Sequence, residues 1–139
     1  MTAKLLLELV SPERQYISTE VDEVYAPGAE GDLGILPDHA AFFCALRPGE
    51  FRYTVGGNVE YAVVNGGFLE VKENKVTVLA DGAELGIEID IEDALRCKLQ
   101  AEQDFEAAKT KDAEVYNAAE AKLARELIRI NVAERYSKR

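Results

Sequence analysis

Apolar and polar residues alternate with one period over the first part of the chain and with another over the last part. In residues 3–10, Leu5, Leu7 and Leu9 alternate with the residues between them, which is the period of a half-buried strand. Six further short runs are rich in β-branched and aromatic residues and carry the same prediction. They are residues 20–26, 41–46, 51–55, 59–64, 67–71 and 75–80.

Turn-forming residues separate these runs. Pro48–Gly49, Gly56–Gly57–Asn58 and Glu73–Asn74 favour tight connections. Gly66–Gly67 suits either a turn or a bulge. Eight to ten strands at this spacing are typical of an antiparallel sandwich or a flattened barrel. We predict an N-terminal antiparallel β-sandwich of about ten strands.

The period changes at Asp90, beyond which the sequence has no glycine or proline. Asp90 suits a helix N-cap, and apolar residues then recur at spacings of three and four. Residues 109–112 break this pattern, and Asp112 suits the N-cap of a second helix. The two apolar faces comprise Ala94, Leu95, Leu99, Ala101, Phe105 and Ala108, and then Val115, Ala119, Leu123, Leu127 and Ile130.

The sequence therefore predicts an α+β chain with a β-sandwich in residues 1–86 and an antiparallel two-helix hairpin in residues 87–139. The helical faces are rich in alanine, which buries little area, and burial contributes only ~25 cal/mol per Å². Such a hairpin can form and yet come apart or undock, so we expect a mobile element. A static two-helix appendage remains the alternative.

Composition restricts the class of protein. Of the 139 residues, 47% are hydrophobic and 30% are charged, which favours a packed fold over disorder. The net charge of −10 argues against a nucleic-acid binder and against binding to anionic lipid. We see no signal or transit pattern and no apolar run long enough to span a bilayer, and we expect no direct membrane insertion. Cys44 and Cys97 have no CxxC partner, and we expect reduced thiols in a cytosolic setting.

A search for catalytic chemistry finds little. The single histidine, His39, has no cysteine or second histidine near it in the sequence, so we interpret it as a loop or interface residue. Cys44 lies in an apolar run, where a buried thiol is the default. No nucleotide-binding lysine motif, nucleophile elbow or metal-binding motif occurs. We expect no catalytic residue, no metal and no cofactor.

Residues 26–40 are the most distinctive stretch. They hold Gly28, Gly31 and Gly34, two prolines and three acidic residues. Acids would repel a phosphate, so a phosphate-binding loop is excluded. We interpret the stretch as a surface loop that presents a contact surface.

Four segments in order resemble one known family. PGAEGDLGILPDHA, LRPGEFRY, NGGFLEVKENKVTVLADGAE and the alanine-rich helix entry that begins EID are similar to the epsilon subunit of bacterial F-type ATP synthase. The resemblance covers nearly the whole chain and implies the same sandwich and hairpin. It also implies a non-catalytic central-stalk role that couples proton translocation to ATP synthesis, at the cytoplasmic face of the bacterial inner membrane.

The resemblance assigns partners to parts of the chain. The sandwich is expected to dock on the gamma subunit and on the c-ring, with Glu30, Gly31 and Asp32 facing the c-ring loops and His39 near gamma. The hairpin is expected to inhibit ATP hydrolysis by rising along gamma toward the catalytic beta and alpha subunits. Its basic face comprises Lys122, Arg125, Arg129 and Arg135, followed by Lys138 and Arg139. A merely solvated basic face is the alternative.

Some members of this family bind ATP in the compact hairpin. The positions that match their motif are Glu84, Ile89, Asp90, Ala94, Arg125 and Arg129. Asp93 and Gln100 depart from it, and Asp93 stands where the motif has arginine. A carboxylate beside a triphosphate replaces attraction with repulsion, so we expect weak ATP binding or none.

Two other readings stay open. A free ligand-binding sandwich could use Gly66–Gly67 and the neighbouring strands as a pocket, although such a binder has no need of a basic helical hairpin. An enzyme would need a catalytic constellation that the sequence does not offer.

Overall fold

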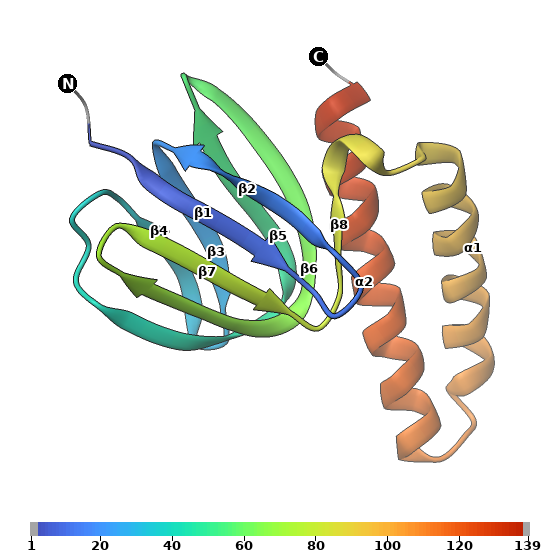
Figure 1. The fold of residues 1–139 in the computed structure, drawn as a ribbon. Helices are drawn as coiled ribbons and strands as arrows, with labels where there is room; N and C mark the ends of the chain where they lie inside the picture. The colour runs from blue at the N-terminus through green and yellow to red at the C-terminus, as the bar shows by residue number, and fades with distance from the viewer. Residues whose placement is uncertain (1–2, 138–139) are drawn as a thin grey trace. The chain divides into compact units, whose positions relative to one another are not determined.

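The computed structural model describes residues 3–137. The chain divides into two compact units, Met1–Leu85 and Gly86–Arg139. The first unit is a sheet of eight strands and the second is helical (Figure 1). The strands are β1 (Leu5–Val10), β2 (Gln15–Val21), β3 (Glu23–Gly28), β4 (Gly31–Ile35), β5 (Phe42–Val55), β6 (Asn58–Lys72), β7 (Lys75–Ala80) and β8 (Ala83–Leu85).

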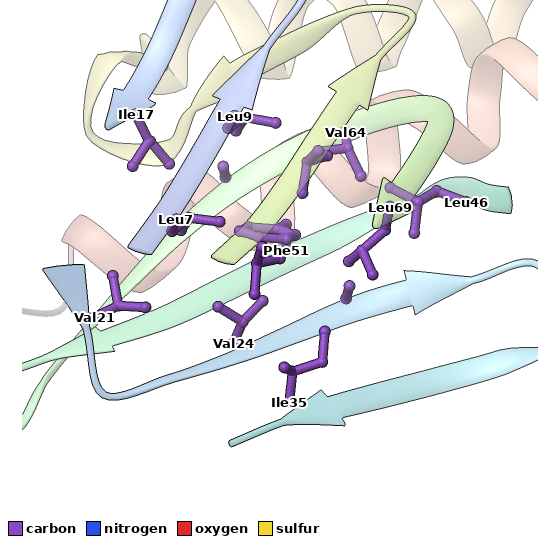
Figure 2. Packing of buried hydrophobic residues seen from close by; sticks show 14 of the residues in the cluster. Leu7, Leu9, Ile17, Val21, Val24, Ile35, Leu46, Phe51, Val64 and Leu69 are labelled. Carbon is purple, nitrogen blue, oxygen red and sulfur yellow. The ribbon is translucent and has the colours of Figure 1, made fainter. Parts of the chain in front are cut away.

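The sheet folds over itself to form the predicted sandwich. Its strand order is β2-β1-β7-β6-β5-β3-β4, with β8 beside β6. Ile17 on β2 and Ile35 on β4 come from opposite ends of this order and yet belong to one buried cluster. Figure 2 shows side chains from these strands converging around Phe51, which is fully buried. Enclosing such side chains is the main stabilising term, at about 2 kcal/mol for each fully buried leucine.

The alternation in the first strand is confirmed. Leu5, Leu7 and Leu9 are fully buried, and Leu6 between them is exposed. The run predicted at residues 20–26 is instead the end of β2 and most of β3, separated at Asp22. Our prediction omitted the first part of β2, because its mixed polar sequence does not alternate clearly.

The sheet has eight strands rather than the expected ten, because β5 and β6 each combine two of the predicted runs in one long strand. The antiparallel register of β5 and β6 is the same on both sides of Pro48–Gly49 and Gly66–Gly67, so neither dipeptide is a turn. Gly66 and Gly67 have φ values of 95° and 129°, which let β6 bend without a change of register. On one side of the bend β6 pairs with β8, and on the other with β7. Bends of this kind allow a strand to pass between layers.

One strand pair is parallel rather than antiparallel. β1 pairs with β7 in parallel, from Leu6↔Lys75 to Val10↔Leu79, and the other pairings in residues 3–137 are antiparallel. The predicted turns at Gly56–Gly57 and Glu73–Asn74 are confirmed, and Glu73 and Asn74 both have positive φ. Two consecutive positive φ values match the twist of a tight hairpin.

The second unit is the predicted helical hairpin. A short 3₁₀ turn, η1 (Gly86–Glu88), precedes α1 (Ile91–Ala108) and α2 (Ala113–Ser137). Asp90 is the N-cap of α1 and accepts from the backbone N–H groups of Glu92 and Asp93. Asp112 caps α2 by accepting from the N–H of Val115 at 3.0 Å. Ala94, Ala101 and Ala108 are buried, whereas Leu95, Leu99, Val115 and Leu127 are exposed.

Candidate functional site

The stretch predicted as a contact loop is mostly a β-hairpin. β3 and β4 pair from Val24↔Ile35 to Gly28↔Gly31, and Ala29 and Glu30 form the turn. A Cβ on Gly28 would lie 2.5 Å from the carbonyl oxygen of Gly31, so the two strands approach too closely for a side chain there. The tip is therefore a compact, defined structure rather than an irregular loop.

Strand β5 fastens this tip. The N–H of Ala29 donates to the carbonyl of Ala45 at 2.9 Å. Arg47 donates through Nη1 to the carbonyl of Gly28 at 2.6 Å and through Nη2 to Oδ1 of Asp32 at 2.6 Å. Charge-assisted hydrogen bonds of this kind fix geometry as well as charge. One arginine thus holds both arms of the hairpin.

The two acidic side chains at the tip differ in their surroundings. Both are exposed to solvent, but Asp32 pairs with Arg47, whereas Glu30 has no hydrogen-bond or ion-pair partner among the described residues. Gly31 lies between them at the start of β4. The structure therefore places Glu30, Gly31 and Asp32, the predicted c-ring contacts, at the exposed turn of the β3–β4 hairpin.

A hollow of about 480 Å³ lies beside the tip, between the β3–β4 hairpin and the start of β5. Its lining includes Glu30, Asp32, Phe42, Phe43 and Cys44. Partial burial raises the pKa of the Cys44 thiol, which favours its neutral, less reactive form. Acidic and aromatic side chains thus lie together around this hollow, at one edge of the sandwich.

His39 lies in the loop after β4. Its Nδ1 is 2.7 Å from the carbonyl oxygen of Ala40, and its ring is edge-on to Phe42 at 6.1 Å between centroids. The preceding residue, Asp38, exchanges two hydrogen bonds with Asn74 of the β6–β7 turn. Within residues 3–137 no group of three metal-ligating side chains occurs. His39 is thus half-buried at the surface, beside the start of β5.

Near the tip lies a row of exposed apolar side chains that we did not predict from the sequence. Phe43 is 63% exposed and stacks on Phe68, with 5.6 Å between centroids and 15° between planes. Leu79 on β7 lies opposite Phe68 and is also exposed. The available signal was the Phe42–Phe43 pair at the start of β5, which breaks the alternation of a half-buried strand. Exposed apolar residues grouped in this way mark a contact surface.

At Gly66–Gly67 the backbones of neighbouring strands approach closely. A Cβ on Gly67 would lie 2.1 Å from the carbonyl oxygen of Leu79, because the backbones of β6 and β7 are in close contact there. The N–H of Asp81 donates to the carbonyl of Gly66 at 3.0 Å. These two glycines therefore serve close strand packing.

The residues that match the nucleotide motif are divided between the two units. Glu84 lies on β8 of the first unit. In the second unit, Ile89 and Asp90 precede α1, and Ala94 is buried in its first turn. Arg125 is an exposed residue of α2.

Arg129 is not available as a free phosphate contact. Its Nη2 donates to Oδ2 of Asp93 at 2.9 Å, and its side chain is only 17% exposed. Asp93, the residue that departs from the motif, therefore pairs with the arginine that the motif assigns to ATP. Gln100, the second departure, donates to Asp104 on its own helix at 2.9 Å.

The predicted basic face is smaller than expected. Lys122 and Arg125 are exposed, whereas Arg129 is mostly enclosed. At about 100° per residue, Arg135 lies roughly 120° around the helix from Arg129. Lys138 and Arg139 lie outside the described residues.

Comparisons with known proteins agree on one family. Residues 4–86 match the family model described as ATP synthase, Delta/Epsilon chain, beta-sandwich domain. The ATP synthase epsilon chain of Dehalococcoides mccartyi is 45% identical over 136 residues, which cover 98% of this chain and 96% of that one. The epsilon chain of Carboxydothermus hydrogenoformans is 52% identical over 103 residues, covering 74% and 77%.

Solved structures show the same fold. A chain in the mitochondrial ATP synthase of Euglena gracilis, in an assembly of OSCP, F1 and c-ring, superposes with a TM-score of 0.75 at 22% identity, covering 99% of this chain and 82% of that one. A chain in the central stalk and c-ring of the Tetrahymena thermophila mitochondrial ATP synthase gives a TM-score of 0.63 at 16% identity, covering 95% and 98%. No helix in residues 3–137 has the length and apolar character needed to span a bilayer.

Proposed function

This chain belongs to the ATP synthase epsilon chains, and on that premise we propose that it is a non-catalytic rotor subunit of the central stalk. It couples proton translocation to ATP synthesis and restrains ATP hydrolysis through its C-terminal helices. The observation that carries the proposal is the match to bacterial epsilon chains across both units, over 98% of the chain.

The sandwich is the coupling part of the proposal. A subunit that transmits torque needs a stiff contact with its neighbours, and the β3–β4 tip is held to β5 by Arg47. The acids Glu30 and Asp32 would meet the polar loops of the c-ring, where complementary charge fixes register. The gamma subunit would contact the surface around His39, which continues into the exposed aromatic residues Phe42 and Phe43.

The hairpin is the regulatory part. Its helices pack through alanine and leave Leu95, Leu99, Val115 and Leu127 exposed, so a second arrangement against apolar partner surfaces is physically accessible. Lys122 and Arg125 provide positive charge for acidic loops of the catalytic beta and alpha subunits. In this arrangement the hairpin would inhibit hydrolysis without taking part in the chemistry.

Nucleotide binding is a lesser element of the proposal. Because Arg129 already pairs with Asp93, we infer that ATP binds weakly or not at all. Isothermal titration of the full chain with ATP tests this, and micromolar affinity would contradict it. The subunit would lie at the cytoplasmic face of the bacterial inner membrane as a peripheral part of the complex.

The deciding experiment compares ATP hydrolysis and ATP-driven proton pumping in complexes reconstituted with the full chain and with a chain ending at Glu88. Faster hydrolysis with retained pumping supports both halves of the proposal. Unchanged hydrolysis removes the regulatory half, and loss of pumping contradicts the assignment of coupling to the sandwich. The full-length double variant Glu30→Gln/Asp32→Asn is the matched test of the tip, and we expect it to reduce pumping.

A further inference from the structure

The two helices of the hairpin are joined by an ion pair at its open end. Asp93 lies in the first turn of α1 and Arg129 lies in the second half of α2, 36 positions later, and they are 2.9 Å apart. Arg129 is mostly enclosed, and Asp93 is about one-third exposed. Arg129 donates through its Nη2, and this hydrogen bond, with the charges of Arg129 and Arg96, lowers the pKa of Asp93. Asp93 therefore stays ionised at neutral pH.

Each member of this pair also has a second partner on its own helix. Asp93 Oδ1 accepts from Arg96 three positions along α1. Arg129 Nη1 lies 3.8 Å from Glu126 Oε2, three positions back along α2. Residues three apart are neighbours on a helix surface, so both local pairs remain possible when the helices separate. Separation of α1 from α2 would leave neither charge without a partner.

Glu126 is incompletely satisfied in the closed hairpin. Its Oε2 is buried and has no hydrogen-bond partner among the described residues, because the nearest guanidinium nitrogen of Arg129 is too far away for one. A buried carboxylate oxygen without a hydrogen bond is unfavourable. When Arg129 is released from Asp93, it can turn fully to Glu126 and remove that penalty.

The other packing at this end of the hairpin is apolar, and on α2 it involves the buried Ile130, Val132 and Ala133. Between the helices the buried residues of α1 are Ala94, Ala101 and Ala108. The aromatic contact of Phe105 with Tyr116, at 5.3 Å between centroids, lies next to the connecting turn, where the chain already holds the helices together. The Asp93–Arg129 pair adds a charged contact to this apolar packing at the open end.

We propose that Asp93 and Arg129 form an exchangeable latch, in which Arg129 pairs with Asp93 when the hairpin is closed and with Glu126 when it opens. This inference deepens the proposed regulation and rests on it for its physiological role. Because an internal carboxylate holds the arginine, the hairpin closes without a nucleotide. Its closure is weakened by ionic strength, since a partly exposed pair is screened by salt.

The latch is tested by measuring the distance between the helices in the isolated full chain. Spin labels are placed on Cys97 of α1 and on a cysteine introduced at the exposed Ala124 of α2, in a Cys44→Ser background. The fraction of molecules with a long distance reports opening, and it is measured at low and at high ionic strength. Circular dichroism confirms that each variant retains its helices.

The latch predicts that the open fraction rises in some variants and falls in others. We expect Asp93→Asn and Arg129→Gln each to raise the open fraction about two- to five-fold, the factor expected for a partly exposed ion pair. The double variant should open no more than either single one, because both remove the same interaction. Glu126→Gln should lower the open fraction, because the open hairpin then loses its alternative ion pair, whereas the closed hairpin loses only a pair at 3.8 Å. Gln100→Ala, which removes the hydrogen bond to Asp104 on the same helix, should have no effect.

An unchanged distance distribution in Arg129→Gln, additive effects in the double variant, or opening by Glu126→Gln would each overturn the latch. ATP hydrolysis by the reconstituted complex then separates this inference from the proposed function. If Arg129→Gln opens the hairpin but leaves hydrolysis unchanged, the latch stands and the regulatory role is wrong.

Discussion

Asp38 and Asn74 hold the loop after β4 against the β6–β7 turn through two reciprocal hydrogen bonds. The N–H of Asp38 donates to Oδ1 of Asn74 at 2.6 Å, and Nδ2 of Asn74 donates to Oδ1 of Asp38 at 3.2 Å. Both residues have positive φ, at 66° and 62°. The loop that carries His39 is thus positioned by a turn 36 residues away in sequence.

Asn74→Gly should lower the free energy of unfolding by about 1 kcal/mol, because it removes these side-chain hydrogen bonds but keeps the positive φ at little cost. Asn74→Ala should cost roughly 1 kcal/mol more, because alanine is strained at this φ. Urea unfolding measures both. Equal stability of the two variants would show that backbone strain is unimportant at this turn.

Gly67→Ala should prevent normal folding of the sandwich. The added Cβ would overlap the backbone of β7 at Leu79, and the φ of 129° is itself unfavourable for alanine, so we expect a loss of about 3 kcal/mol or more. Gly57→Ala is the matched control, because Gly57 also has a positive φ but an added Cβ would meet no other atom there. It should cost about 1 kcal/mol. Thermal unfolding and soluble yield separate the two outcomes.

Phe43→Ser should leave stability nearly unchanged and weaken binding to the gamma subunit. The ring is largely exposed and stacks only on Phe68 among the aromatic contacts of the described residues, so its loss removes contact surface rather than core. Phe51→Ala should behave in the opposite way, with a loss of about 3–5 kcal/mol in stability, because this ring is fully buried. Undiminished gamma binding by a folded Phe43→Ser variant would exclude the aromatic row from the contact.

The ion pair of Lys4 with Asp22 predicts a specific acid response. The hydrogen bond from Lys4, aided by the N–H of Gly56, lowers the pKa of Asp22 below its ordinary value of 3.8. A carboxylate whose pKa is lower in the folded than in the unfolded protein stabilises the fold at pH values above its unfolded-state pKa. This stabilisation is lost as the pH falls through its folded-state pKa. Asp22→Asn should therefore be less stable than the parent at pH 6, and the difference should be smaller at pH 2.

Urea unfolding at both pH values measures this difference. Lys4→Met is the matched variant, because it removes the other half of the pair. A difference that persists unchanged at low pH would show that Asp22 acts through its backbone position rather than through its charge.

The sequence was sufficient for the local features of the fold. Alternation in residues 3–10 and the capping aspartates Asp90 and Asp112 depend on neighbouring residues, and the structure confirms them. Pro48–Gly49 and Gly66–Gly67 were misread because a bend within a long strand uses the same residues as a turn. Pairing with β3, β7 and β8 decides whether a bend or a turn forms, and the residues next to the dipeptide do not reveal this pairing.

The candidate sites were predictable to different degrees. The acidic tip follows from the composition of residues 26–40. The Asp93–Arg129 pair does not, because it requires the register of the two helices, and single-helix spacing reveals only the local pairs of Asp93 with Arg96 and of Arg129 with Glu126. The exposed aromatic row depends on the alignment of β5, β6 and β7, which likewise arises from long-range pairing.

The parallel pairing of β1 with β7 has a consequence for biosynthesis. β1 is made first, but its partner strand in the sheet begins at Lys75, so on the ribosome β1 waits for some seventy residues before that edge can be covered. Pairing over such a separation slows folding, because a large loop must close before the contact is gained. β2, which follows directly, can protect the other edge of β1 as an early hairpin. Substitutions that weaken the β1–β2 hairpin should therefore reduce the yield of nascent chains more than they reduce the stability of the finished protein.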